Sequence, residues 1–264
     1  MSSTVKTFEL LGFFSQLRPE IGLSELCRLA KRDKATTHRH LQYLEEVGLV
    51  EQNIVTREYR LGPAILQLAQ TREVTVPRKL GAQRALKKLV DATGETAHVS
   101  VLSRSTLYTL AFHESTKHSI RVVIDVPTLP LHATASGLSV LAFGDSDLMS
   151  MAAKKLKPFT KQTAITRRKL EKAVNDARAS GFGRANRTFE DEVYSLAVPL
   201  FDQTGKVAGA LSVASVASRL SEQADLEIRQ QLMKAGREIS RNWGGSISES
   251  VETCWAKALA NADT

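Results

Sequence analysis

The residues best suited to specific chemistry form a polar face on a predicted helix at residues 34–47. Leu41, Leu44 and Val47 recur at helical spacing and define the opposite, apolar face. The outward face comprises Ala35, His38, Arg39 and Gln42, with Thr36 at its flank. Hydroxyl, imidazole and guanidinium groups in the first turns of a helix suit the DNA major groove, which admits a helix and displays hydrogen-bonding base edges. The pattern therefore predicts a recognition helix.

A shorter helical pattern at residues 23–30 and a charged turn precede this polar face, and Gly48 supplies a stop signal after it. The cations that gather around the turn and the predicted recognition helix, opposed by Asp33 alone, are Lys31, Arg32, Lys34 and Arg39. Two amphipathic helices joined by a short turn also occur in many helical proteins. The two helices alone therefore leave a purely structural interpretation open.

An extended segment at residues 49–61 follows the predicted recognition helix directly. It contains two short extended runs around residues 53–56, which is the pattern of a β-hairpin. A helix-turn-helix followed by a hairpin is a winged helix, and Arg57 near the hairpin tip is placed to reach a phosphate or the minor groove. The combination favours DNA binding over the structural interpretation.

Two further helices are predicted in the N-terminal part of the chain. The first runs from Val5 to Gln16, is rich in apolar residues and is ended by Pro19. It should pack beneath the two helices described above. Pro63 opens the second, because proline is favourable in a first helical turn, and Pro77 breaks it. We interpret this second segment as a linker helix whose exposed apolar stripe suits self-association.

The rest of the chain predicts an α+β domain with antiparallel strands and flanking helices, the architecture of a small-molecule sensing module. The expected elements are helices at 78–91, 133–143, 167–180 and 221–243, strands at 96–101, 106–112 and 119–123, and a hairpin of strands at 194–201 and 206–215. We interpret His98 and His113 as sheet-surface residues. The tail to Thr264 is weakly patterned.

Composition limits the classes of protein that the chain can represent. A length of 264 residues accommodates one large domain or two modest ones, and a hydrophobic fraction of 42% is ordinary for a globular protein. The formal net charge of +8 favours polyanionic partners without proving one. Neither a bilayer-spanning apolar run nor a signal-peptide pattern is present, which predicts a cytoplasmic protein without a membrane partner. Cys27 and Cys254 are too few and too far apart for a disulfide framework or zinc site, and we expect no metal or cofactor.

Five stretches carry a resemblance to a known family: KATTHRHLQYLEEVGLV, EYRLGPAILQLA, TGETAHVSVL, LHATASGLSVLAF and SLAVPLFDQTGKVAGALSVAS. In their order and spacing, from about Val5 to Leu220, the chain resembles the IclR family of bacterial transcription regulators. The resemblance implies a winged-helix DNA-binding domain at 1–62, a linker helix at 63–77 and a GAF-like effector-binding domain at 78–243, which leaves a C-terminal tail at 244–264. It also implies dimers, or dimers of dimers, that bind palindromic promoter sites, often beside genes for carbon-source or aromatic-acid catabolism.

The resemblance also implies which residues contact DNA. Carried over by position, these contacts fall on Lys34, Thr36, His38 and Arg39. Gln42 and Arg57 join them from the residue pattern described above. Ala35 stands where the family usually has serine, so one phosphate hydroxyl is missing. Thr37 and His40 occupy positions that are usually apolar, and the helical wheel turns both toward the core.

An effector pocket in the C-terminal domain follows from the same resemblance. Its lining should come from Ala135, Ser136, Gly137, Ser195, Ser212, His118 and Arg121. Backbone N–H groups at a helix N-terminus bind anions, so an effector carboxylate could rest at Ser136 and Gly137. Arg121 could then pair with the carboxylate in a bidentate manner.

Departures from the family's pattern shift the expected charge of this pocket toward positive. Leu138 replaces the usual lysine, Arg187 and Thr188 replace an acidic pair, and Glu192 replaces a glycine. We therefore expect a different or more anionic ligand. Purely structural roles stay open for four residues. Ser195 and Ser212 could be small residues of a packed sheet, and Arg121 could be a solvated strand residue. His132 could be a histidine that makes only structural hydrogen bonds.

Three classes of function follow from these patterns. The leading hypothesis is a ligand-responsive transcription factor, in which effector binding biases the spacing of two winged helices on DNA. The alternative is a ligand-independent architectural DNA-binding protein. An enzyme is disfavoured because the sequence has no GxSxG nucleophile elbow, P-loop, HExxH motif or dinucleotide fingerprint.

Overall fold

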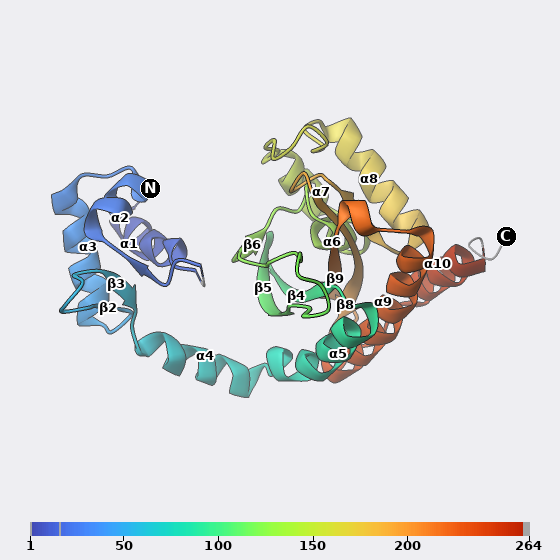
Figure 1. Ribbon diagram of the computed structural model, residues 1–264, viewed down its shortest axis with the longest axis horizontal. Helices are drawn as coiled ribbons and strands as arrows, with labels where there is room; N and C mark the ends of the chain where they lie inside the picture. The colour runs from blue at the N-terminus through green and yellow to red at the C-terminus, as the bar shows by residue number, and fades with distance from the viewer. Residues whose placement is uncertain (1, 16, 261–264) are drawn as a thin grey trace. The chain divides into compact units, whose positions relative to one another are not determined.

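The computed structural model describes residues 2–15 and 17–260 (Figure 1). The chain forms two compact units: an N-terminal unit of residues 1–77 with 125–127, and a C-terminal unit of residues 78–124 with 128–264. The elements of the N-terminal unit are α1 (Ser3–Glu9), the 3-10 helix η1 (Leu10–Phe13), β1 (Glu20–Ile21), α2 (Leu23–Ala30), α3 (Lys34–Glu46), β2 (Val50–Gln52), β3 (Tyr59–Leu61) and α4 (Ala64–Thr75). The two helices α2 and α3 and the β2–β3 hairpin are the predicted winged helix.

A three-stranded antiparallel sheet closes the winged helix, in the order β1-β3-β2. The first helix is shorter than predicted, because α1 ends at Glu9 and a 3-10 turn follows. Gly12 lies in that turn and disfavours a continuous helix, and the extended backbone at Phe14 turns its ring into the core. Gln16, the predicted end of this helix, lies outside the described residues.

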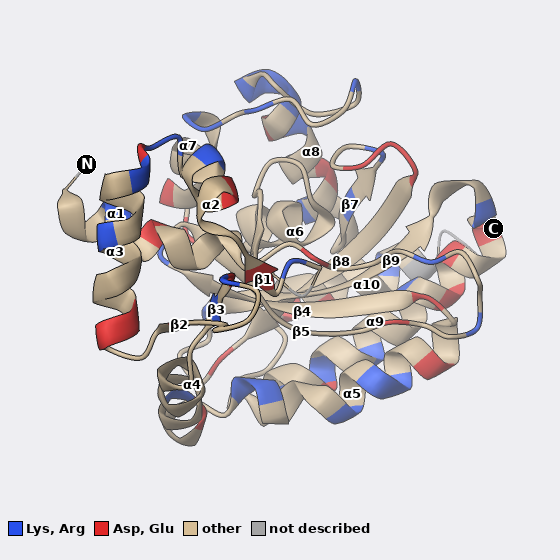
Figure 2. Cartoon of the chain, turned by 60° about the vertical axis from the view of Figure 1, so that its left-hand side comes forward, with Lys and Arg blue, Asp and Glu red and all other residues tan. Residues whose placement is uncertain are grey.

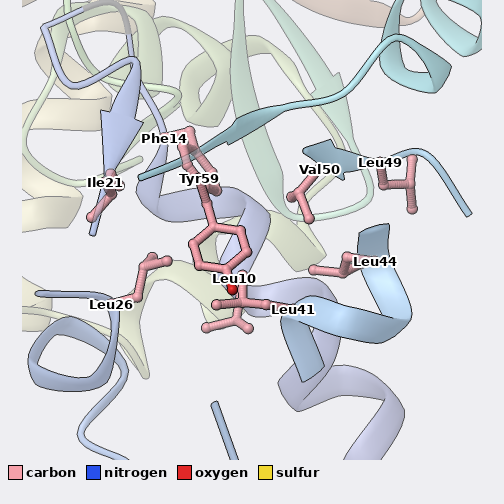
Figure 3. Packing of buried hydrophobic residues seen from close by; sticks show 9 residues of the cluster. All are labelled: Leu10, Phe14, Ile21, Leu26, Leu41, Leu44, Leu49, Val50 and Tyr59. Atoms are coloured by element: carbon pink, nitrogen blue, oxygen red, sulfur yellow. The ribbon is translucent and has the colours of Figure 1, made fainter. Parts of the chain in front are cut away.

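The core of the N-terminal unit joins the elements from η1 to β3 (Figure 3). Its nine buried residues are Leu10, Phe14, Ile21, Leu26, Leu41, Leu44, Leu49, Val50 and Tyr59. Leu41 and Leu44 hold α3 by its apolar face, and burying each stabilises the unit by about 1.5–3 kcal/mol. Val47, predicted to share this face, is 60% exposed because the helix ends at Glu46.

The C-terminal unit contains one six-stranded antiparallel sheet, in the order β6-β5-β4-β9-β8-β7. Its strands are β4 (Thr96–Ser103), β5 (Thr106–His113), β6 (Thr128–Leu129), β7 (Gly183–Asn186), β8 (Val193–Phe201) and β9 (Val207–Val216). Its helices are α5 (Arg78–Thr93), α6 (Ala135–Phe143), α7 (Asp147–Ala153), α8 (Arg167–Ser180), the 3-10 helix η2 (Ala217–Arg219), α9 (Glu222–Asn242) and α10 (Glu249–Ala260). The predicted α+β architecture is confirmed.

Helices cover the central strands of this sheet on both faces. The adjacent helices α5 and α9 (Figure 1) pack on the face that carries Leu196 and Val198, and Val198 meets Gly236 of α9. The helix α6 packs on β7, β8 and β9, against alanines of the opposite face such as Ala185 and Ala197. The side chains of that second face are small or polar, so it leaves room for close approach by a helix terminus.

The predicted strand at 119–123 is wrong, because this segment has irregular backbone. It is held instead by a hydrogen bond from Thr96 Oγ1 to the carbonyl oxygen of Val122, at 2.8 Å. Val122 and Ile124 are nevertheless buried and pack beside Ala214. These buried apolar side chains gave the sequence the pattern of a strand, although the segment forms no strand hydrogen bonds with the sheet.

The weakly patterned tail contains a docked helix, α10. Trp255 of α10 is completely buried, and its indole N–H donates to the carbonyl oxygen of Gly181 at 2.9 Å. Arg237 of α9 pairs with Glu252 of α10 at 2.6 Å and lies over the Trp255 ring. These contacts make α10 part of the C-terminal unit.

Candidate functional sites

The N-terminus of α3 is built by its own capping residue. Asp33 accepts a hydrogen bond from the backbone N–H of Thr36 at 2.8 Å, which satisfies one free donor of the first turn. This hydrogen bond holds the pKa of the Asp33 carboxyl below its usual value. The cap and the two buried leucines together orient the polar face outward.

The predicted DNA-contacting residues lie as the helical wheel indicates. Lys34, His38, Arg39 and Gln42 are exposed on α3, and Thr36 is half-buried. Figure 2 shows basic residues in the N-terminal part of α3 and acidic residues at its C-terminal end. A polyanion would therefore meet favourable charge at the first turns of the helix.

Thr37 and His40 are both buried, which confirms their predicted inward orientation. Thr37 Oγ1 donates to the carbonyl oxygen of Asp33 at 2.9 Å, and His40 Nε2 lies 3.4 Å from Ser3 Oγ. Burial, reinforced by the nearby charge of Arg32, lowers the pKa of His40. Thr37 thus bonds within its own helix, whereas His40 contacts α1 through Nε2 and its buried Nδ1 has no partner among the described residues.

The wing is a hairpin with a tightly bonded tip. Asn53 accepts hydrogen bonds from the N–H groups of Val55 and Thr56, at 2.9 and 3.3 Å. Arg57 is exposed and has a φ of 62°, a left-handed conformation that is uncommon for a residue with a side chain. Gln52 Nε2 donates to the Arg57 carbonyl oxygen at 2.8 Å and holds that conformation.

In the C-terminal unit, the N-terminus of α6 is a tightly enclosed helix end. Thr134 caps it by accepting the N–H of Gly137 at 3.1 Å, and Ala135, Ser136 and Gly137 are all buried. A Cβ atom at Gly137 would lie 2.4 Å from the Leu131 backbone, so this approach requires glycine. The three predicted lining residues therefore sit where a helix end meets a closely packed loop.

A polar row on the sheet lies against this helix end. His98 of β4 pairs with Ser212 of β9, which pairs in turn with Ala197 of β8, so the three side chains share one face. His98 Nε2 lies 3.1 Å from Ser136 Oγ, and Ser212 Oγ donates to the Leu196 carbonyl oxygen at 2.9 Å. The structure thus brings together His98, Ser136 and Ser212.

The interpretation of His98 as a sheet-surface residue is wrong. His98 is buried, because β4 lies inside a sheet that helices cover on both faces. Burial lowers the pKa of its imidazole to about 4, so His98 is neutral near pH 7. Its Nδ1 has no hydrogen-bond partner among the described residues. His113, by contrast, is exposed as expected.

The other predicted lining residues are less closely grouped. Ser195 is half-buried on β8, opposite Ala214 and Ala185. Arg121 is exposed, and its Nε donates to Glu114 at 2.9 Å, while His118 is half-buried. The pairing of Arg121 with an effector carboxylate therefore stays a prediction and would require this ion pair to open.

His132 has a structural environment. Its Nε2 lies 2.9 Å from the carbonyl oxygen and 3.2 Å from the amide nitrogen of Lys157, and its ring lies beside that of Phe159.

No helix in the described part of the chain is long and apolar enough to cross a membrane. Residues 2–15 and 17–260 also contain no group of three or more His, Cys, Asp or Glu placed to hold a metal ion.

Comparison with known proteins identifies both units. The family described as "Bacterial transcriptional regulator IclR C-terminal" matches residues 78–241, and the "IclR helix-turn-helix domain" matches residues 3–53. These matches define a helix-turn-helix transcription regulator with a C-terminal domain of the IclR type. The chain belongs to the IclR family, whose members are DNA-binding regulators and not enzymes.

Curated relatives and solved structures agree with this assignment. The regulators XynR and KdgR of Escherichia coli are 26% and 28% identical to this chain, over 92% of it and 98% and 93% of their own lengths. An IclR regulator from a Silicibacter species is 36% identical, with a TM-score of 0.81 over 94% of this chain and 99% of its own. An IclR homologue from Microbacterium hydrocarbonoxydans, solved with 4-hydroxybenzoate, is 22% identical and shares the fold, with a TM-score of 0.74 over 92% of this chain and 99% of its own.

Proposed function

We propose that this IclR-family regulator binds a promoter operator as a dimer or dimer of dimers, and that a small organic carboxylate or aromatic acid switches it. The observation that carries this proposal is the enclosed polar row of His98, Ser136 and Ser212 in a unit attached to a DNA-binding winged helix. As a regulator of bacterial genes, the protein would act in the cytoplasm.

The winged helix would contact DNA through two kinds of interaction. Arg39, His38, Thr36 and Gln42 would face base edges in the major groove, where a bidentate arginine–guanine pair contributes about 1–3 kcal/mol of discrimination. Lys34 and Arg57 would contact phosphates and position the helix without reading sequence. The exposure of five of these six side chains, and the partial exposure of Thr36, support their availability for contact with DNA.

The effector would bind at the N-terminus of α6. The helix dipole there favours a carboxylate, and Ser136 offers a small polar side chain at that end, whereas the Gly137 N–H is held by Thr134 and the Leu131 backbone packs against Gly137. The 4-hydroxybenzoate in the Microbacterium homologue is an anion of this class. Ala135, Ser195, Ser212, His118 and Arg121 would complete the site, with the basic Arg187 replacing the family's usual acid and favouring a more anionic ligand.

The linker helix α4 would join two copies of the chain. None of its residues 64–75, all of which the structure describes, is buried. Leu66, Leu68 and Val74 are 67%, 61% and 84% exposed, although each would stabilise a packed interface. Pairing through α4 would hold two winged helices at one spacing, as a palindromic operator requires.

Effector binding would alter operator affinity by changing the spacing of the winged helices. A coupling free energy of about 1–3 kcal/mol between the two sites is enough for a useful switch. A gel shift on the intergenic DNA beside the protein's own gene, with and without candidate carboxylates, tests this proposal. Operator binding that no candidate acid changes would leave only the ligand-independent architectural role.

The variant Ser136→Leu separates the two activities in the same assay. Its side chain would fill the space at the α6 N-terminus, so the effect of the acid on operator binding should disappear. Operator binding without ligand should be retained. Loss of both would show that Ser136 is a folding position and would contradict its role in the effector site.

A further inference from the structure

The tip of the wing exposes two large apolar side chains. Ile54 is 87% exposed and Val55 is 89% exposed, the two highest exposures among the large hydrophobic residues that the structure describes. Burying such side chains is worth about 1.5–3 kcal/mol each, so their display in water is unfavourable unless they contact something. Single exposed apolar residues are common on protein surfaces, but an adjacent pair on a projecting tip is a more specific feature.

The backbone that carries this pair is held rigidly. Asn53 Oδ1 accepts from the N–H of Val55, and the Asn53 N–H donates to the Glu58 carbonyl oxygen at 2.8 Å. The Arg57 N–H donates to the Asn53 carbonyl oxygen at 2.9 Å and closes the turn. The left-handed conformation of Arg57 persists because these bonds determine it, and such conformations often occur at functional sites. The two side chains are thus presented in advance of any contact.

Charge indicates the occupant of this surface. Arg57 stands beside the apolar pair, and Lys34 and Arg39 of α3 are exposed in the same unit. A partner that is both polyanionic and able to receive apolar side chains is duplex DNA, whose minor groove, about 6 Å wide, admits a narrow tip but not a helix. Apolar wedges of isoleucine size enter between base steps in the minor groove and kink the duplex.

We propose that Ile54 and Val55 form an apolar wedge that enters the operator's minor groove and bends the DNA while α3 lies in the major groove. This inference rests on the proposed DNA-binding function and adds a second, shape-dependent source of specificity to it. Pyrimidine–purine steps such as TA unstack with the smallest cost, so operators should carry such a step beneath each wing.

The test uses the full chain and duplexes that the wild-type protein selects from a random-sequence library. The double variant Ile54→Ser with Val55→Ser should bind the selected duplex about tenfold more weakly. Energy transfer between dyes at the duplex ends should show a bend with the wild type and a smaller bend with the variant. The slope of log affinity against log salt should stay unchanged, because no charge is lost, whereas Arg57→Ala should reduce it by about one.

Two control variants make the result specific. Ile54→Leu keeps the wedge and should keep the bend, and Ile120→Ser removes a similarly exposed isoleucine, 71% accessible, from the C-terminal unit without effect on DNA. If the wild type leaves the selected duplex straight, or if the double variant matches the wild type in affinity and bend, the wedge proposal is overturned while the DNA-binding proposal stands. A double variant that changes only the sedimentation of the free protein would assign the tip to a contact between copies and overturn it too. Failure to select any duplex would overturn the DNA-binding proposal together with the wedge.

Discussion

Two clusters of polar side chains are proposed to bind ligands, and their environments are opposite: the exposed group on α3 contacts solvent, and the enclosed group around His98 is buried. On α3, basic and polar side chains face solvent from a helix whose other side is held by Leu41 and Leu44. In the C-terminal unit, His98, Ser136 and Ser212 are enclosed between a sheet and a helix end. A polyanion is recognised by many exposed contacts with long side chains, whereas a small acid requires few contacts from which water is excluded.

The enclosed group can be tested by weakening the unit that surrounds it. Trp255→Ala should lower the free energy of unfolding of the C-terminal unit by about 3–5 kcal/mol, because it removes a completely buried side chain and its hydrogen bond to Gly181. Denaturant unfolding followed through the fluorescence of Trp243 measures this loss. Below the transition, the winged helix should retain its affinity for non-specific DNA. A loss under about 1 kcal/mol would show that α10 contributes little to the core.

Acid should act on the enclosed group through His98. Its pKa is about 4 in the folded protein against 6.5 for the free side chain, so the unfolded chain binds a proton that the folded protein excludes. Stability is therefore retained above pH 6.5 and falls as the pH decreases toward 4, by on the order of 2–3 kcal/mol. Unfolding free energies of the wild type and His98→Gln across this range measure the difference. Parallel pH profiles would contradict a neutral, buried His98.

On the exposed group, the expected effect is on specificity and not on folding. Arg39→Ala should lower affinity for the operator by about 1–3 kcal/mol, because it removes a side chain placed to read a base edge. Binding isotherms on operator and random duplexes separate the two contributions. Equal losses on both duplexes would make Arg39 a phosphate contact.

Lys34→Ala should produce the smallest change. Removing one phosphate contact should weaken operator and random duplexes alike and reduce the salt slope by about one. Titrations at several salt concentrations give this slope. If the variant discriminates less well between operator and random DNA than the wild type, Lys34 contributes to base readout.

Local sequence periodicity correctly predicted which side chains of α3 face solvent, but it did not predict that His98 is enclosed. The wheel for α3 placed Thr37 and His40 inside and Arg39 outside, because one apolar stripe decides the orientation of an amphipathic helix. The same kind of pattern placed His98 on the surface, because alternation along one strand does not reveal whether a helix covers its second face. Sequence alternation also predicted a strand near Val122, where packing occurs without a ladder.

By itself, the sequence determined the winged helix, the exposed recognition face, the α+β class of the second unit and the family. These follow from contacts between residues close in the chain and from motifs in a characteristic order. Only the tertiary structure decided that His98 meets Ser136, 38 residues away, and that Trp255 closes the core against Gly181, 74 residues away. Such partners are chosen by how separately formed helices and strands pack, and this choice leaves no periodic signal in either segment.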